Sequence, residues 1–208
     1  MLHRPIAIAV LLLSGLAGGQ ASAQDAIGAV SRIQGEASGT RGGATGALNL
    51  NAPVFLNEVV STGDAARLEV TFVDNTRLTL GEKAKLTLDT YLFNPAAGGG
   101  TIKFGMVGAF RFLSGRLSKL ASADARVTTP FATLGIRGTE FWGGPIDNQV
   151  LGVFLIEGIV GVSNAAGQQI LNRPGQGTNI NTPGAAPGPV TLWPLDKVNR
   201  AIATVTFR

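Results

Sequence analysis

The sequence predicts an all-β fold of short strands, arranged as a sandwich, a barrel or a solenoid, and three observations support this prediction. Apolar and polar residues alternate with a period of two along much of the chain. Strand-like runs recur about every eight to twelve residues, and the turns between them are rich in glycine, of which the chain has 29. No long window before residue 190 has the period of an amphipathic helix.

The first residues predict export from the cytoplasm. Arg4 gives a positive start, and the apolar run from Ile6 to Leu13 is too short to span a bilayer. Ala21-Ser22-Ala23 has the small residues that a leader peptidase accepts. We therefore expect a signal peptide at residues 1–23, cleaved after Ala23, and a periplasmic or secreted protein. An uncleaved membrane anchor is the alternative.

The clearest strand pair lies in residues 67–80. Leu68, Val70 and Phe72 point to one face, and Arg67, Glu69 and Thr71 point to the other. Asp74-Asn75-Thr76 forms the turn, because aspartate and asparagine tolerate the backbone angles that a turn needs. Leu78 and Leu80 then resume the alternation, so the run predicts two half-buried antiparallel strands.

Further strands follow in order. We expect a strand in 84–93, a flexible loop in 94–100 and one or two strands in 101–118. Residues 125–143 predict two strands around a break at Pro130. Residues 148–164 predict two strands with a turn at Glu157-Gly158, and residues 167–180 a last short pair.

Residues 24–181 are thus one predicted all-β domain, followed by a linker and tail in 182–208. Residues 182–190 are rich in proline and glycine, which is typical of a linker. The tail forms either one short helix from Pro194, with Val198, Ile202 and Val205 as its apolar stripe, or a frayed end.

Composition excludes several classes of chemistry. The chain has no cysteine, and its one histidine, His3, lies in the predicted signal peptide. We therefore expect no disulfide, no metal, no cofactor and no imidazole-based catalysis. The formal net charge is +4, without a lysine or arginine run, so we expect no nucleic-acid partner. No segment after the signal peptide predicts a transmembrane helix.

The run Val127–Gly143 is the most distinctive stretch. Gly135 and Gly138 allow positive φ or a close backbone approach, and Arg137 lies between them. We favour a structural interpretation, in which the Arg137 guanidinium lies inside the fold and clamps a turn or pairs with a carboxylate. The candidate carboxylates are Glu157, Glu140 and Asp74. The functional alternative is an anion or sugar site.

Three sequence motifs, in residues 60–80, 129–141 and 157–162, occur in an order that closely resembles the FecR domain family. The resemblance covers about residues 27 to 180. This chain matches the first motif of the family at Val60, Thr62, Gly63, Ala66, Leu68, Phe72, Asp74, Thr76, Leu78 and Leu80. The second matches at Thr129, Pro130, Ala132, Gly135, Arg137, Gly138, Thr139 and Phe141, and the third at Glu157, Gly158, Val160 and Val162. We expect the structural motif to comprise Thr129, Pro130, Gly135, Arg137, Gly138, Thr139, Glu157 and Gly158.

The resemblance implies, among the three arrangements, an all-β solenoid-like fold, a β-roll of short strands with glycine-rich turns. It also implies a periplasmic or extracellular module for signalling or binding. The best-known members are anti-sigma regulators of iron uptake with a cytoplasmic segment, one membrane helix and a further periplasmic domain. We recognise none of these parts in the sequence, so we expect a free-standing exported binding or scaffold module. Its expected partner is another cell-envelope protein; a sensor of glycans or anionic polymers is the alternative.

Two other classes are less favoured. An enzyme would need paired carboxylates or an activated nucleophile, and nothing in the sequence pairs two of the candidate acids. These acids are Asp64, Asp74, Asp89, Asp124, Glu140 and Glu157. A small outer-membrane barrel would fit export and alternation, but the chain has one tyrosine, two tryptophans and no aromatic girdles.

Overall fold

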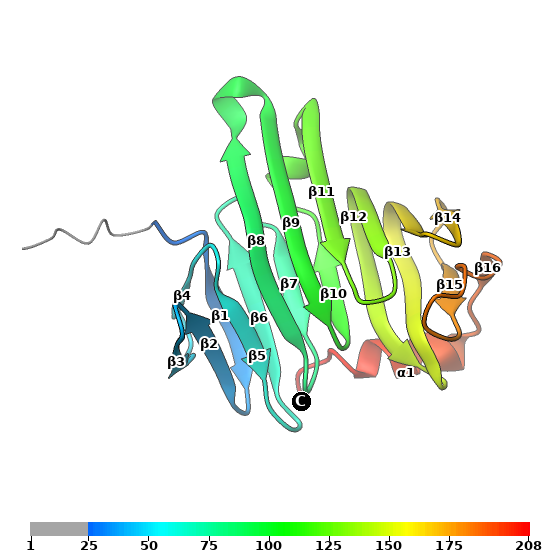
Figure 1. The fold of residues 1–208 in the computed structure, drawn as a ribbon, viewed down its shortest axis with the longest axis horizontal. Helices are drawn as coiled ribbons and strands as arrows, with labels where there is room; N and C mark the ends of the chain where they lie inside the picture. Colours follow the sequence, from blue (N-terminus) through cyan, green and yellow to red (C-terminus); the bar gives the residue numbers. More distant parts are fainter. Residues whose placement is uncertain (1–24) are drawn as a thin grey trace, which may run out of the picture.

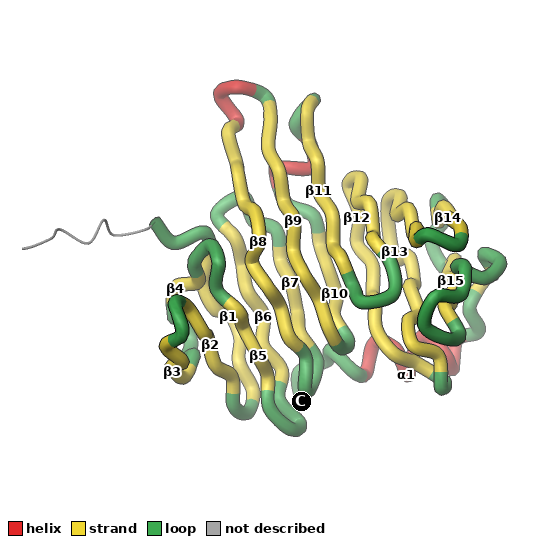
Figure 2. The backbone as a smooth tube through the Cα atoms, viewed as in Figure 1, coloured by secondary structure: helices red, strands yellow, loops and turns green. Residues whose placement is uncertain are grey.

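The computed structural model describes residues 25–208, and the predicted signal peptide at residues 1–23 lies outside them. Within this range the fold is mostly β, which confirms the predicted class (Figures 1 and 2). All strands of these residues belong to one 16-stranded sheet. The first strands are β1 (Gly28–Gln34), β2 (Ala37–Arg41), β3 (Ala44–Ala47), β4 (Pro53–Val54), β5 (Val59–Thr62), β6 (Arg67–Phe72), β7 (Arg77–Leu80) and β8 (Lys85–Asn94).

The second half of the chain adds longer strands and three short helices. The order is η1 (Pro95–Ala97), β9 (Gly99–Val107), β10 (Phe110–Leu113), η2 (Arg116–Lys119), β11 (Ser122–Thr128), β12 (Thr133–Ile146), β13 (Gln149–Asn164), β14 (Gly167–Leu171), β15 (Gln176–Ile180), β16 (Thr191–Leu192) and α1 (Leu195–Ala203). None of the helices within residues 25–208 is both long and apolar enough to cross a lipid bilayer.

The sheet divides into two layers at β12. Residues 133–136 of β12 pair with β11, whereas residues 140–143 pair with β10 along the same side of the strand. The front layer of Figure 1 runs β3-β2-β5-β8-β9-β11, and the back layer runs β4-β1-β6-β7-β10. β12 and its neighbour β13 therefore connect both layers.

The structure does not clearly show the predicted solenoid. A solenoid stacks successive coils side by side with parallel pairing, whereas here β9 and β11 form the one parallel pair among residues 25–208. The other pairs are antiparallel, and strands far apart in sequence, such as β1 and β6, lie next to each other. The alternation of apolar and polar residues predicts that a segment is a strand, but it does not predict which strands pair, because it depends only on which side chains are buried.

The main core lies between the two layers. Phe72 of β6 stacks on Phe104 of β9 at 4.9 Å between ring centroids, and on Tyr91 of β8 at 5.4 Å. Leu68, Val70, Leu78 and Leu80 are buried as the alternation predicted. Burying these aliphatic and aromatic side chains is the main stabilising contribution to the fold.

A buried carboxylate lies at one edge of this core. Asp74 follows β6 and is 0% exposed. Its carboxylate accepts hydrogen bonds from Thr76 N (3.0 Å), Thr76 Oγ1 (2.8 Å), Tyr91 Oη (2.8 Å) and Leu117 N (3.1 Å). The carboxylate thus connects its own turn to β8 and to η2.

The single tyrosine offers a direct test of this arrangement. Burial, together with the hydrogen bond to Asp74, raises the pKa of Tyr91 well above its ordinary value of 10.0. The folded state therefore holds the neutral phenol, and its stability is unaffected below pH 10 but falls as the pH rises above it. We expect tyrosinate absorbance to appear only together with loss of the β circular dichroism signal. Ionisation in a still folded protein would contradict this.

Helix α1 covers the outer side of β12 and β13. Ala201 and Val205 pack with Trp142, Phe154 and Trp193 in a second apolar cluster. Trp142 Nε1 also donates a hydrogen bond to Thr204 Oγ1 (3.0 Å). Of the two alternatives for the tail, the structure shows the helix, which starts one residue after Pro194. Val198 and Ile202 lie on it and pack against this cluster, whereas Val205 lies beyond its last residue, Ala203.

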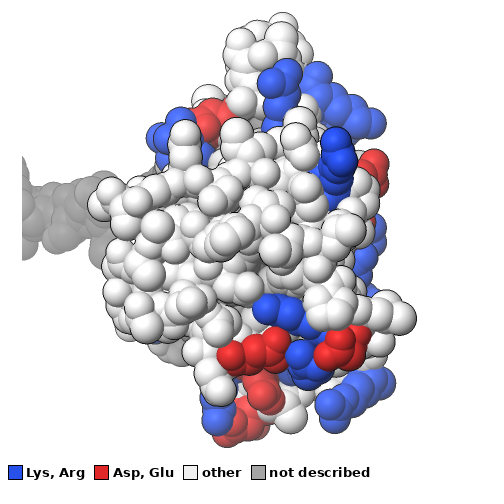
Figure 3. Space-filling view, turned by 90° about the vertical axis from the view of Figure 1, so that its right-hand side faces the viewer, with Lys and Arg blue, Asp and Glu red and all other residues white. Residues whose placement is uncertain are grey.

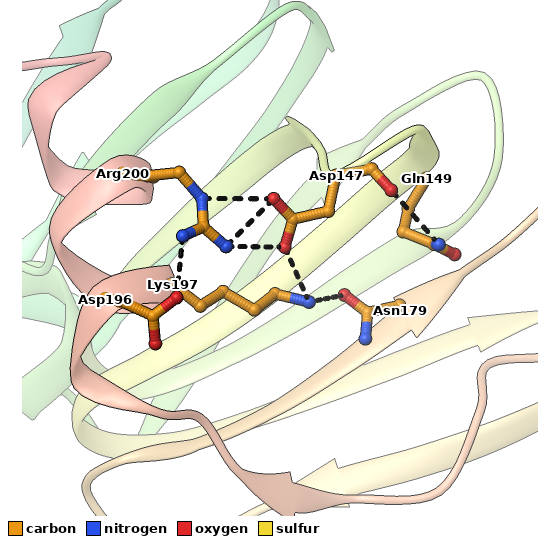
Figure 4. A network of polar contacts seen from close by, with 6 residues as sticks. All are labelled: Asp147, Gln149, Asn179, Asp196, Lys197 and Arg200. Carbon is orange, nitrogen blue, oxygen red and sulfur yellow. Dashed lines mark hydrogen bonds and ion pairs between the residues drawn. The ribbon is translucent and has the colours of Figure 1, made fainter.

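Ion pairs fix the exposed side of α1 (Figure 4). Arg200 pairs with Asp147, in the turn after β12, at 3.1 Å and with Asp196 at 2.7 Å. Lys197 lies 3.7 Å from Asp147 and donates a hydrogen bond to Asn179. The bonds to Arg200 lower the pKa of both Asp147 and Asp196 below 3.8.

Acidification is expected to loosen α1 before the main core unfolds. The lowered pKa values mean that these ion pairs stabilise the fold fully above pH 3.8 and are lost as the pH falls through the folded-state pKa. Both tryptophans lie in the cluster beside α1, so their emission should shift to the red while the β circular dichroism signal persists. Asp147→Asn should show part of this shift at neutral pH. Simultaneous loss of both signals would contradict the prediction.

Candidate functional site

The distinctive run identified in the sequence forms the corner at which β12 passes from one layer to the other. The pairing of β12 with β13 shifts register between Arg137 and Glu140. Gly138 has φ +56° at this point, and Gly158 on β13 has φ +86°. The predicted turn at Glu157-Gly158 is therefore wrong, because the residues form an irregularity within one continuous strand, β13.

Thr139 satisfies the backbone groups that the corner leaves unpaired. Its side chain is buried, and its hydroxyl lies 2.6 Å from the carbonyl oxygen of Ile159 and accepts a hydrogen bond from Ile159 N at 3.2 Å. The backbone N–H of Thr139 donates to Ser114 Oγ (2.9 Å), and Ser114 N donates to Thr139 O (2.9 Å). The threonine thus joins β12, β13 and the segment after β10.

Thr129 and Pro130 form the turn that precedes β12. Thr129 N donates to Ala132 O (2.9 Å), while Thr129 Oγ1 accepts from Ala132 N (3.0 Å) and from Phe131 N (3.2 Å). Pro130 is exposed within the break between β11 and β12, as predicted. These residues explain the turn without any ligand.

Arg137 does not act as the internal clamp that the sequence suggested, and that expectation is wrong. The residue is exposed on the outer face of β12. Glu140 pairs with Arg111, and Asp74 is enclosed by other donors. Within residues 25–208, Arg137 forms no ion pair and its side chain no hydrogen bond. The corner satisfies its own polar groups through Thr139, so it needs no guanidinium inside.

Arg137 instead borders a shallow groove on the outer face of β11, β12 and β13, which we call the glycine groove. Its volume is about 370 Å³. Gly135 and Gly161 lie directly opposite each other on β12 and β13, and a Cβ atom added at either position would meet no atom within 4 Å. The lining residues are Ala123, Asp124, Ala125, Arg126, Thr133, Gly135, Ile136, Arg137, Ile159 and Ser163.

The groove combines positive charge with apolar side chains. Arg126 is bound to Asp124 at 2.8 Å, whereas Arg137 remains available. Ile159, opposite Arg137, is 42% exposed, and Ile170, opposite Gly161, is 60% exposed. Sequence reasoning found Arg137 and Gly135 but missed Arg126, Ile159 and Gly161, because their proximity depends on strand register.

Two other hollows are less suited to specific binding. One, of about 690 Å³, lies beside β2, β3 and β5 and has Glu36 as its one ionisable lining residue. A smaller one of about 160 Å³ contains Glu69 and Glu140. Both carboxylates are already engaged, Glu140 with Arg111 and Glu69 with Ser31 (2.9 Å) and Thr79 (3.3 Å).

Comparison with known proteins relates this fold to one family. A family model described as FecR protein matches residues 58–161. Two crystal structures of a candidate anti-sigma factor from Parabacteroides distasonis ATCC 8503, at 1.65 and 2.50 Å resolution, are similar in fold. Each has a TM-score of 0.55 and 18% sequence identity over 69% of this chain. The match covers 64% and 63% of those chains, which is less than two thirds of their length. No curated protein matches in sequence.

Proposed function

Because the chain belongs to the FecR protein family, we propose that it is a non-enzymatic binding or signalling module that acts through contact with another protein. The observation that carries the proposal is the glycine groove, where a family motif places an available guanidinium beside exposed aliphatic side chains. Arginine and exposed aliphatic groups are common in protein interfaces.

We further propose that the module works in the cell envelope, in the periplasm or after secretion. The signal-peptide pattern of residues 1–23 supports this location. Cleavage after Ala23 would make Gln24 the first residue. Intact mass measured on the periplasmic and secreted fractions tests the proposal, and an uncleaved chain found only in the cytoplasm would refute it.

The solved structures are named as a candidate anti-sigma factor, and that name supports a regulatory contact with a protein. It does not identify the partner, since the sequence identity is 18%. We therefore propose a protein partner in the envelope and assign no sigma factor to it.

Site-directed photo-crosslinking in intact cells tests the protein contact. A photoreactive residue replaces Ile170 beside the glycine groove, and Val73, an exposed aliphatic residue in the turn after β6, serves as the matched control. We expect a discrete adduct from position 170 and none from position 73. Absence of any adduct, or the same adducts from both positions, would count against the proposed function.

A further inference from the structure

We propose that the glycine groove binds an extended acidic peptide segment that carries aliphatic side chains. This inference deepens the proposed function, on which it rests, by stating the chemistry of the partner. It follows from the charge of the groove, from its floor and from the uncharged surface next to it.

The charge of the groove favours a carboxylate-bearing partner. Its lining contains Arg126, Arg137 and Asp124, and the Asp124 carboxylate is already bound to Arg126. Lys103 of β9 lies opposite Arg126 in the next strand and is exposed. A carboxylate can therefore approach Arg137 without displacing an ion pair, and guanidinium groups bind carboxylates with two hydrogen bonds.

The floor of the groove admits a peptide backbone. Three cross-strand rows succeed one another along β12 and β13: Thr133 with Ser163, Gly135 with Gly161, and Arg137 with Ile159. Residues two apart on a strand are about 6.8 Å apart, which is also the spacing of alternate side chains in an extended peptide. A peptide lying along the strands can thus place its backbone over the glycines and alternate side chains at the neighbouring rows.

The surface beside the groove favours aliphatic side chains in the partner. Residues 158–195 contain Arg173 as their one charged residue. Figure 3 shows the end of the molecule that carries β14, β15 and β16, and its charged side chains lie mainly at the margins. Ile159 of β13 and Ile170 of β14 are both exposed. The groove lining contains no aromatic ring on which a sugar could stack, so a peptide fits it better than a glycan.

Fluorescence anisotropy with a labelled ten-residue peptide of alternating glutamate and valine tests the inference. We expect saturable binding that weakens as the salt concentration rises. A lysine–valine peptide tests the sign of the charge and a glutamate–serine peptide tests the aliphatic contribution, and both should bind at least about fivefold more weakly. Polygalacturonate, an anionic glycan, should not compete.

Two variants locate the binding. Arg137→Ala should weaken binding about fivefold, because an exposed charge pair contributes modestly. In Gly161→Val the new side chain would occupy the floor of the glycine groove, so peptide binding should weaken more than about tenfold. No atom would contact the new Cβ, and valine suits a strand, so this variant should fold. The matched controls are Arg173→Ala, and Gly46→Val on β3, where the space is also open.

The outcomes separate this inference from the proposed function. Unchanged binding in Arg137→Ala and Gly161→Val would overturn the groove as the peptide site, as would equal binding of the lysine–valine peptide. Binding of polygalacturonate in place of the peptide would assign the groove to a glycan. Crosslinking to a protein from Ile170 in cells could still succeed in either case, so the proposed function is tested independently.

Discussion

Replacing Asp74 with alanine is expected to remove a large part of the stability of the fold. The carboxylate is fully buried and accepts hydrogen bonds from three other residues, namely Thr76, Tyr91 and Leu117. Its removal leaves buried donors without partners and removes the side-chain hydrogen bonds that join the β6–β7 turn to β8 and η2. Because each unsatisfied buried group costs about 1–3 kcal/mol, we expect a loss of about 4 kcal/mol or more in the free energy of unfolding. That is a large part of the stability of a typical domain.

Chemical denaturation followed by circular dichroism measures this effect. Asp89→Ala is the matched control, since Asp89 is an exposed aspartate on β8, and it should stay within about 0.5 kcal/mol of the unchanged protein. Asp74→Asn should be intermediate, because an amide oxygen accepts hydrogen bonds while its NH₂ group faces donors. Equal stability of Asp74→Ala and Asp89→Ala would show that the buried network contributes little.

The sequence predicted those parts of the fold that depend on local patterns. The alternation in residues 67–80 placed Leu68, Val70, Leu78 and Leu80 in the core, and Asp74-Asn75-Thr76 in the turn. It did not predict that Asp74 is buried and reaches Tyr91 and η2, because these contacts join residues 17 to 43 positions apart. Asp74 and Thr76 are among the positions that match the family motif, but the motif alone does not show that they form a buried hydrogen-bond network.

The candidate site shows the same limit. The sequence singled out Arg137 and its glycines, but periodicity alone could not decide between an internal clamp and an exposed groove. The backbone irregularity at Gly138 and Gly158 determines which arrangement forms. It turns β12 from one layer to the other and leaves Arg137 on the outer face of the sheet. Gly138, Thr139 and Gly158 of the motif therefore build the corner, whereas Gly135 and Arg137 border the groove.

Replacing Gly158 with alanine is expected to break this corner. Gly158 has φ +86°, which costs an alanine about 1–2 kcal/mol. Its added Cβ would also overlap the carbonyl of Gly138 and lie 2.8 Å from Thr139 Cα, and both are backbone atoms that cannot turn aside. We expect the variant to lose more than about 3 kcal/mol of stability, as measured by thermal and chemical unfolding.

Gly161→Ala provides the matched control on the same strand. Its Cβ would meet no atom within 4 Å, and Gly161 does not have a positive φ, so the substitution should leave stability equal or slightly higher. A stable Gly158→Ala protein would mean that β13 relaxes around the added methyl group. The register of β12 against β13 would then not depend on this glycine, and neither would the outward position of Arg137. Because that position is the basis of the glycine groove, this pair of alanine variants tests the architecture of the site before any ligand is added.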